Sequence, residues 1–78
     1  MVVQAYVLVQ TEVGKAASVA EEISRINGVV LAEDVTGPYD VIVRVEASSV
    51  EELGPLVMSK IQGVQGIDRT VTCTVVHA

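Results

Sequence analysis

A short stretch near the midpoint of the chain carries the groups best suited to recognise a small polar ligand. It reads Gly37-Pro38-Tyr39-Asp40. Gly37 can adopt a positive φ and Pro38 fixes φ at about −65°, so the pair predicts a chain reversal that exposes backbone amides. Asp40 then either caps this turn or binds the amino group of a ligand, with the amphipathic Tyr39 beside it.

Hydroxyl groups recur at alternate positions near the end of the chain, at Thr70, Thr72 and Thr74. A period of two places them on one face of a strand, where they are either an ordinary strand surface or hydrogen-bonding groups for a polar ligand. Cys73 alternates with them and shares the other face with Val71 and Val75. We expect Cys73 to be a buried small hydrophobe and not a reactive thiol.

Other kinds of chemistry are not indicated. Cys73 is the only cysteine and His77 the only histidine, so a zinc or copper site has no ligand set, and no glycine-rich phosphate loop occurs. His77 is expected to be a solvated chain end. Glu33, Asp34 and Glu46 fit solvated strand charges better than a catalytic pair. We expect no catalytic residue, no metal and no cofactor.

Alternating apolar residues predict the strands that position these groups. Residues 1–10 form a strand that is apolar on both faces. Residues 29–36 and 40–47 form two more, joined by the Gly37-Pro38 turn into a hairpin. Residues 67–77 form the last strand.

Helical spacing of apolar residues predicts two helices between the strands. The first covers residues 14–27 and stops at Asn27-Gly28. The second starts after the N-cap candidates Ser48 and Ser49 and continues to about Lys60-Ile61, with a kink or a tightened first turn at Gly54-Pro55. The order β-α-β-β-α-β predicts an α+β ferredoxin-like plait, a four-stranded antiparallel sheet with both helices on one face.

The composition predicts that the sheet is covered on its second face as well. The chain has 78 residues, so residues 1–78 form a single domain, yet half of them are hydrophobic and the mean hydropathy is +0.51. Two helices cover only one face of the sheet. We therefore expect the other face to pack against a second copy in a homodimer, as a dimeric α/β-barrel.

Charge and pattern exclude two classes of partner. The net charge is −5 and the isoelectric point is near 4.5, which opposes direct contact with nucleic acid. No apolar run approaches the roughly 20 residues that span a bilayer, and no signal segment opens the chain. With a single cysteine, nothing indicates an oxidising compartment, so we expect a cytoplasmic protein without membrane contact.

The two polar stretches also carry a family resemblance. Gly37-Pro38-Tyr39-Asp40 resembles the Gly-x-Tyr-Asp hairpin of the effector-binding domain of the Lrp/AsnC transcription regulators, the regulation-of-amino-acid-metabolism (RAM) domain. The segment from Gly66 to Thr72 resembles that family's lead into the last strand, and Val50-Glu51-Glu52-Leu53 its second helix start. The resemblance covers nearly the whole chain. Family members usually carry a helix-turn-helix domain that this chain lacks, so it resembles the stand-alone form.

The resemblance implies a function. Family members form dimers that assemble into larger rings, commonly octamers, and bind amino acids or similar effectors near interfaces between dimers. Carried over by position, the ligand-binding candidates are Gly37, Tyr39, Asp40, Thr70 and Thr72. The function implied is a non-enzymatic co-regulator of transcription that senses a metabolite and acts with full-length family members. Two alternatives stay open: a small cofactor-free enzyme of the dimeric α/β-barrel type, and an ACT-like amino-acid-binding domain.

Overall fold

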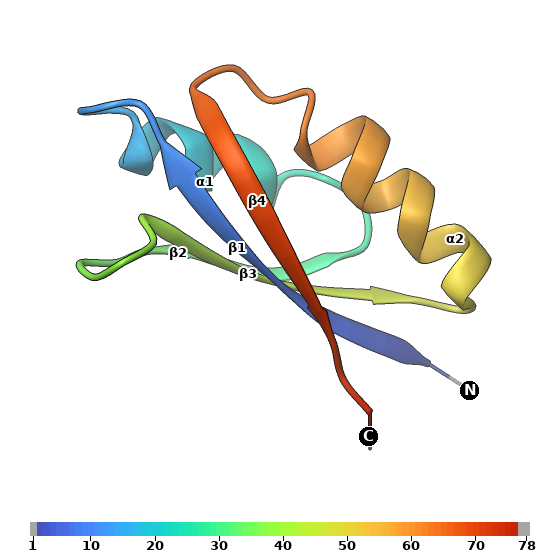
Figure 1. Cartoon of the computed structure of the whole chain (residues 1–78). Helices are drawn as coiled ribbons and strands as arrows, with labels where there is room; N and C mark the ends of the chain where they lie inside the picture. The colour runs from blue at the N-terminus through green and yellow to red at the C-terminus, as the bar shows by residue number, and fades with distance from the viewer. Residues whose placement is uncertain (1, 77–78) are drawn as a thin grey trace.

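The protein has two layers, an antiparallel sheet and a pair of helices that cover one of its faces (Figure 1). The computed structural model describes residues 2–76. Within them the elements are β1 (Val3–Thr11), α1 (Ala16–Ser24), β2 (Val29–Asp34), β3 (Val41–Ala47), α2 (Val50–Pro55), η1 (Leu56–Ile61) and β4 (Ile67–Thr74). The strand order is β2-β3-β1-β4, with every neighbouring pair antiparallel. The ferredoxin-like plait is confirmed.

The core lies between the helices and one face of the two central strands. Alternate residues of β1 and β3 are fully buried there, because a period of two sends them to the same side: Ala5, Val7, Val9, Val41, Val43 and Val45. The helices contribute the other half of the core, with Val19, Ala20, Ile23, Leu53, Leu56, Val57 and Ile61. The buried positions confirm the predicted helical and strand periods.

The first helix is shorter than the predicted residues 14–27, because it ends at Ser24 and the chain turns before Gly28. The N–H of Arg25 closes the last turn, and Gly28 then takes a φ of 103°. A side chain is strained at that φ, and a Cβ on Gly28 would approach Leu56 Cδ2 to 2.8 Å. Gly28 therefore allows both the turn and the close approach of the second helix.

The second helix begins as predicted and continues differently. Ser49 is the N-cap, and its side chain accepts a hydrogen bond from the backbone N–H of Glu52. After Pro55 the chain forms a π-helix instead of a tightened turn, and the N–H of Gln62 donates to the carbonyl of Val57. Because Pro55 lacks an N–H and its ring crowds the preceding turn, the hydrogen-bond register changes there.

The last strand differs from the prediction in the environment of its cysteine. Thr70, Thr72 and Thr74 pair with buried residues of β1, so they face the helices, whereas Cys73 pairs with Tyr6 on the other face. Cys73 is exposed, so the prediction of a buried position is wrong for the single chain. The strand lies at the edge of the sheet and no helix covers that face. His77 lies outside the described residues.

The face of the sheet that the helices leave uncovered, here called the open face, carries large apolar side chains. Tyr6, Leu31 and Ile42 are 41%, 46% and 37% exposed. By register, the open face consists of Gln4, Tyr6, Leu8 and Gln10 on β1, Leu31 and Glu33 on β2, Ile42, Arg44 and Glu46 on β3, and Arg69, Val71 and Cys73 on β4. Apolar area of this kind typically marks an interaction surface.

Candidate functional site

The connection between β2 and β3 is anchored to the end of β1. The N–H of Asp40 donates to the carbonyl of Val9 at 2.9 Å, and the N–H of Val35 donates to the carbonyl of Asp40 at 2.8 Å. The side-chain amide of Gln10 adds a bond of 3.3 Å to the carbonyl of Pro38. Two of these bonds hold the candidate ligand-binding turn against β1, and the bond from Val35 to Asp40 closes the hairpin itself.

The carboxylate of Asp40 has a structural role at this point. Its Oδ2 accepts a hydrogen bond of 2.8 Å from the backbone N–H of Thr11. The pairing of β1 with β4 shifts register between Gln10 and Thr11, so the ladder is locally disrupted there. One interpretation of the sequence made Asp40 the cap of its own turn. In the structure Asp40 instead caps the end of the neighbouring strand β1. The bond uses one of the two carboxylate oxygens of Asp40.

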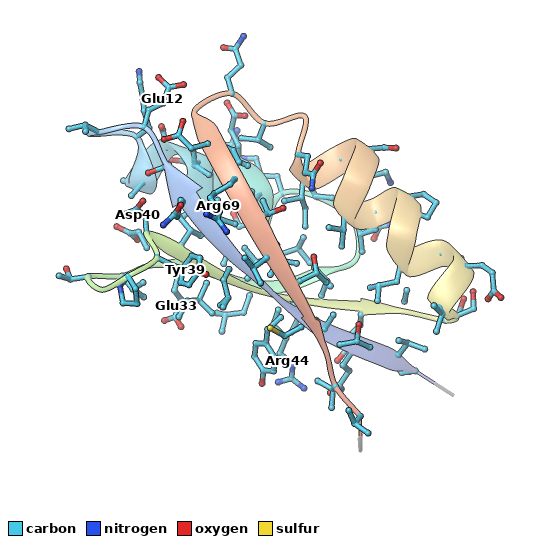
Figure 2. All side chains as sticks on the ribbon, in the orientation of Figure 1. Glu12, Glu33, Tyr39, Asp40, Arg44 and Arg69 are labelled. Carbon is cyan, nitrogen blue, oxygen red and sulfur yellow. The ribbon has the colours of Figure 1, made fainter. Side chains whose placement is uncertain are left out.

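Gly37 and Tyr39 complete the turn in a different way from the sequence prediction. The predicted positive φ at Gly37 is not present: in residues 2–76 only Gly14, Gly28 and Gly66 adopt one. A Cβ at Gly37 would meet no atom within 4 Å, so the glycine opens its backbone to solvent without a steric need for it. Tyr39 is half-buried. Figure 2 shows Tyr39 and Asp40 at the same end of the sheet as Glu33 and Arg69.

The two candidate threonines lie apart from the turn. Thr70 pairs with Val9 and Thr72 pairs with Val7, so both threonines project from β4 toward the helices. Strand β1 lies between β4 and β3, the strand that follows the turn. The hydroxyl of Thr70 accepts a hydrogen bond of 2.9 Å from the side-chain amide of Gln62.

Each threonine lines its own hollow. Thr70 lines one of about 340 Å³ together with Gln62, Ile67, Asp68 and Arg69. Thr72 lines an apolar one of about 230 Å³ with Val50, Leu53, Gly54 and Val57. Gly37, Tyr39 and Asp40 belong to neither. A single chain therefore does not bring the five candidates into one pocket, and a site that uses all of them needs a second chain.

Three residues near the candidates had no role in the sequence analysis. Thr11 donates to Asp40, Gln10 to Pro38, and Gln62 to Thr70. The partners of the first two bonds are 29 and 28 positions apart. The sequence signal for these two bonds is the predicted pairing of the first strand with the hairpin. The register shift between β1 and β4 at Gln10 and Thr11 is not visible in the hydrophobic pattern.

Two classes of feature are not found in the part of the chain that the structure describes. No group of three or more metal-ligating side chains gathers there. None of its helices is both long and apolar enough to cross a bilayer.

The comparisons with known proteins agree with the fold. The family model described as the Lrp/AsnC ligand binding domain matches residues 4–78. An uncharacterised HTH-type transcriptional regulator of Pyrococcus horikoshii is 43% identical over 54 residues, which are 69% of this chain and 36% of the relative. The chain thus matches only about a third of that longer protein.

Solved structures extend the likeness to the whole fold. TTHA0845 from Thermus thermophilus superposes with a TM-score of 0.90 at 32% identity, covering 97% of this chain and 95% of that one. The transcriptional regulator NMB0573 of Neisseria meningitidis, solved in complex with L-Met, has a TM-score of 0.82 at 16% identity over 96% of this chain and 50% of that one. The second likeness shows the fold alone.

The fold and the match along the chain define an α/β domain of the kind described as a ligand binding domain. The chain belongs to the Lrp/AsnC ligand binding domain family.

Proposed function

We propose that this protein binds an amino acid or a related small metabolite and assembles into a homo-oligomer, as a non-enzymatic co-regulator of transcription in the cytoplasm. The observation that carries this proposal is the family model, which matches residues 4–78 and describes a ligand binding domain. The L-Met complex of the Neisseria neighbour supports an amino acid as the ligand class.

The open face supports the homodimer. Its exposed Tyr6, Leu31 and Ile42 lie on the three adjacent strands β1, β2 and β3, with Arg44 between Tyr6 and Leu31. A flat sheet surface of this kind packs best against another sheet, and an identical copy closes the pair with two-fold symmetry. Dimers then assemble further, with an octamer as the expected ring.

The candidate site supports a ligand position at a contact between dimers. Gly37 offers a backbone amide to a carboxylate, the carboxylate of Asp40 can pair with an α-ammonium group, and Tyr39 lies between them. Thr70 and Thr72 project from β4 at a separate place on the surface. In this proposal the turn of one subunit and the threonine face of another together enclose the effector.

The domain organisation supports the co-regulator role. The chain matches 36% of the Pyrococcus relative, whose name is that of an HTH-type regulator, and it matches TTHA0845 over nearly its whole length. We propose that residues 1–78 act as one effector-binding and oligomerisation domain and that this domain associates with full-length family members. Its net charge of −5 opposes contact with DNA of its own.

Isothermal titration of the oligomer with each of the twenty amino acids tests the sensor function. Saturable heat with one or a few of them is expected. Thr70→Val or Thr72→Val should weaken that binding by about tenfold, because each removes a hydroxyl at nearly constant volume. Thr74→Val is the matched control on the same strand face and should bind normally. No heat with any amino acid would overturn the ligand class.

A further inference from the structure

The open face carries both apolar and charged side chains on its two central strands, with Arg44 and Glu46 on β3, and it carries opposite charges at its two edges. Glu33 lies on edge strand β2, opposite Ile42, and Arg69 lies on the other edge strand, β4, opposite Gln10. Both side chains are exposed, and Figure 2 shows them among the labelled residues at the turn end of the sheet. Within residues 2–76 neither takes part in an ion pair within 4.0 Å.

Symmetry leaves two ways to cover this face completely with a second copy. Sheets packed face to face keep their strand directions within about 30°, and a homodimer closes around a two-fold axis. An axis that runs parallel to the strands, between β3 and β1, lays β2 of one subunit over β4 of its partner. An axis perpendicular to the strands lays each strand over its own copy.

The edge charges distinguish these two arrangements. With the parallel axis, Glu33 and the partner's Arg69 lie on facing edges of the two sheets. The two residues are offset along the strand direction by two residues, about 7 Å, and the sheets are about 10 Å apart. Extended glutamate and arginine side chains can span that separation. With the perpendicular axis, Glu33 faces the partner's Leu31, and Arg69 faces the aliphatic end of the partner's β4. Only the parallel axis pairs the charges.

A second group on the open face fits the same arrangement. The Nε of Arg44 is buried without a hydrogen-bond partner, and its NH2 group is 3.9 Å from a carboxylate oxygen of Glu46. The rest of this side chain is open to a partner, because 37% of it is exposed in the single chain. Arg44 lies opposite Tyr6 across β3 and β1, so the parallel axis places it over the partner's Tyr6. The ring and hydroxyl of a tyrosine can both accept a guanidinium group.

We propose that Glu33 and Arg69 form two symmetry-related ion pairs across the homodimer and that these pairs select the parallel-axis orientation. This inference rests on the sheet-to-sheet dimer of the proposed function and names its partner, a second copy of this chain. Exposed pairs add little affinity, but opposed like charges disfavour a wrong pairing, so their contribution is to orientation and partner choice.

Charge reversal tests the pairing, with the dimer dissociation constant measured by sedimentation. Glu33→Arg alone and Arg69→Glu alone each place two pairs of like charges together and should weaken the dimer by about tenfold or more. The double variant restores both pairs and should return to the wild-type value. An equimolar mixture of the two single variants should form a heterodimer that is tighter than either homodimer.

Matched controls use the same changes of charge on the helix side. Asp34→Arg alters the neighbouring position of β2, which pairs with the buried Val41 on the helix face, and Lys60→Glu alters an exposed residue of η1. Both should leave the dissociation constant unchanged. The ion pairs would be overturned, but not the dimer, if the charge reversals at Glu33 and Arg69 changed the dissociation constant no more than these controls do. The same conclusion would follow if a mixture of the two single variants formed no tighter heterodimer. A monomeric wild type would instead overturn the proposed dimer itself.

Discussion

Oδ2 of Asp40 accepts a hydrogen bond of 2.8 Å from the backbone N–H of Thr11, across 29 positions of the chain. The bond lies where β1 shifts its register against β4, and it joins the hairpin connection to the end of the central strand. A residue that could recognise a ligand therefore also stabilises the turn that would present it.

Removal of this acceptor should destabilise the domain. Asp40→Ala leaves the N–H of Thr11 without its partner in a half-buried position, which should lower the free energy of unfolding by about 1–3 kcal/mol. Asp40→Asn keeps an acceptor oxygen and should cost less. Urea unfolding at one fixed protein concentration measures both, with Asp34→Ala on the exposed end of β2 as the control. Equal losses for Ala and Asn would contradict the role of the acceptor.

The glycines of the chain should differ sharply in their tolerance of a side chain. Gly28→Ala combines a positive φ with a Cβ that would lie 2.8 Å from Leu56, so we expect a loss of stability of at least about 1 kcal/mol. Gly37→Ala has neither problem and should be neutral or stabilising by up to about 1 kcal/mol. Thermal unfolding compares the two, and a destabilised Gly37→Ala would show that its backbone is constrained. Because it keeps the fold, Gly37→Ala also tests ligand binding cleanly.

The thiol of Cys73 should report coverage of the open face. It is exposed in the single chain, next to Tyr6 by register, and a face-to-face dimer would bury it. Its rate of reaction with a disulfide reagent should therefore fall as the protein concentration rises through the dimer dissociation constant. The urea-unfolded chain gives the rate for full access. A rate that is independent of concentration in a confirmed dimer would place the interface elsewhere.

A charge at the centre of the open face should dissociate the dimer without unfolding the subunit. Ile42 is 37% exposed and lies opposite Leu8, so Ile42→Asp would place two carboxylates in the apolar interface. We expect a folded monomer by light scattering and circular dichroism. Val13→Asp is the control, since Val13 is fully exposed in the turn after β1 and does not belong to this face. An intact dimer of Ile42→Asp would contradict sheet-to-sheet packing.

Local patterns were sufficient to predict the fold. The period of two in β1 and β3 and the helical spacing of Val19, Ala20 and Ile23 correspond directly to the buried residues. The N-cap at Ser49 and the positive φ at Gly28 follow from the chemistry of single residues, so they too were predictable, whereas the first helix ends earlier than predicted, at Ser24. The order of the elements then left the ferredoxin-like plait as the consistent topology.

What the sequence could not predict depends on contacts between distant segments or on fine changes of register. The bond from Thr11 to Asp40 depends on a β-bulge, and the π-helix after Pro55 depends on how one lost donor is accommodated. Cys73 is exposed because the helices cover the other face of the edge strand β4. A period of two predicts that the faces differ but does not specify which of them the helices cover. The ligand-binding roles of the five candidate residues stay predictions.

The most direct test of the account is light scattering coupled to size-exclusion chromatography, with and without a mixture of the twenty amino acids at millimolar concentration. We predict a dimer or a larger ring, because a second sheet would cover the open face. We also predict a change of mass with the mixture, because the proposed ligand position lies between dimers. Fractions of the mixture would then identify the effector. A monomer at every concentration, with or without amino acids, would contradict both the sheet-to-sheet dimer and the site that depends on it.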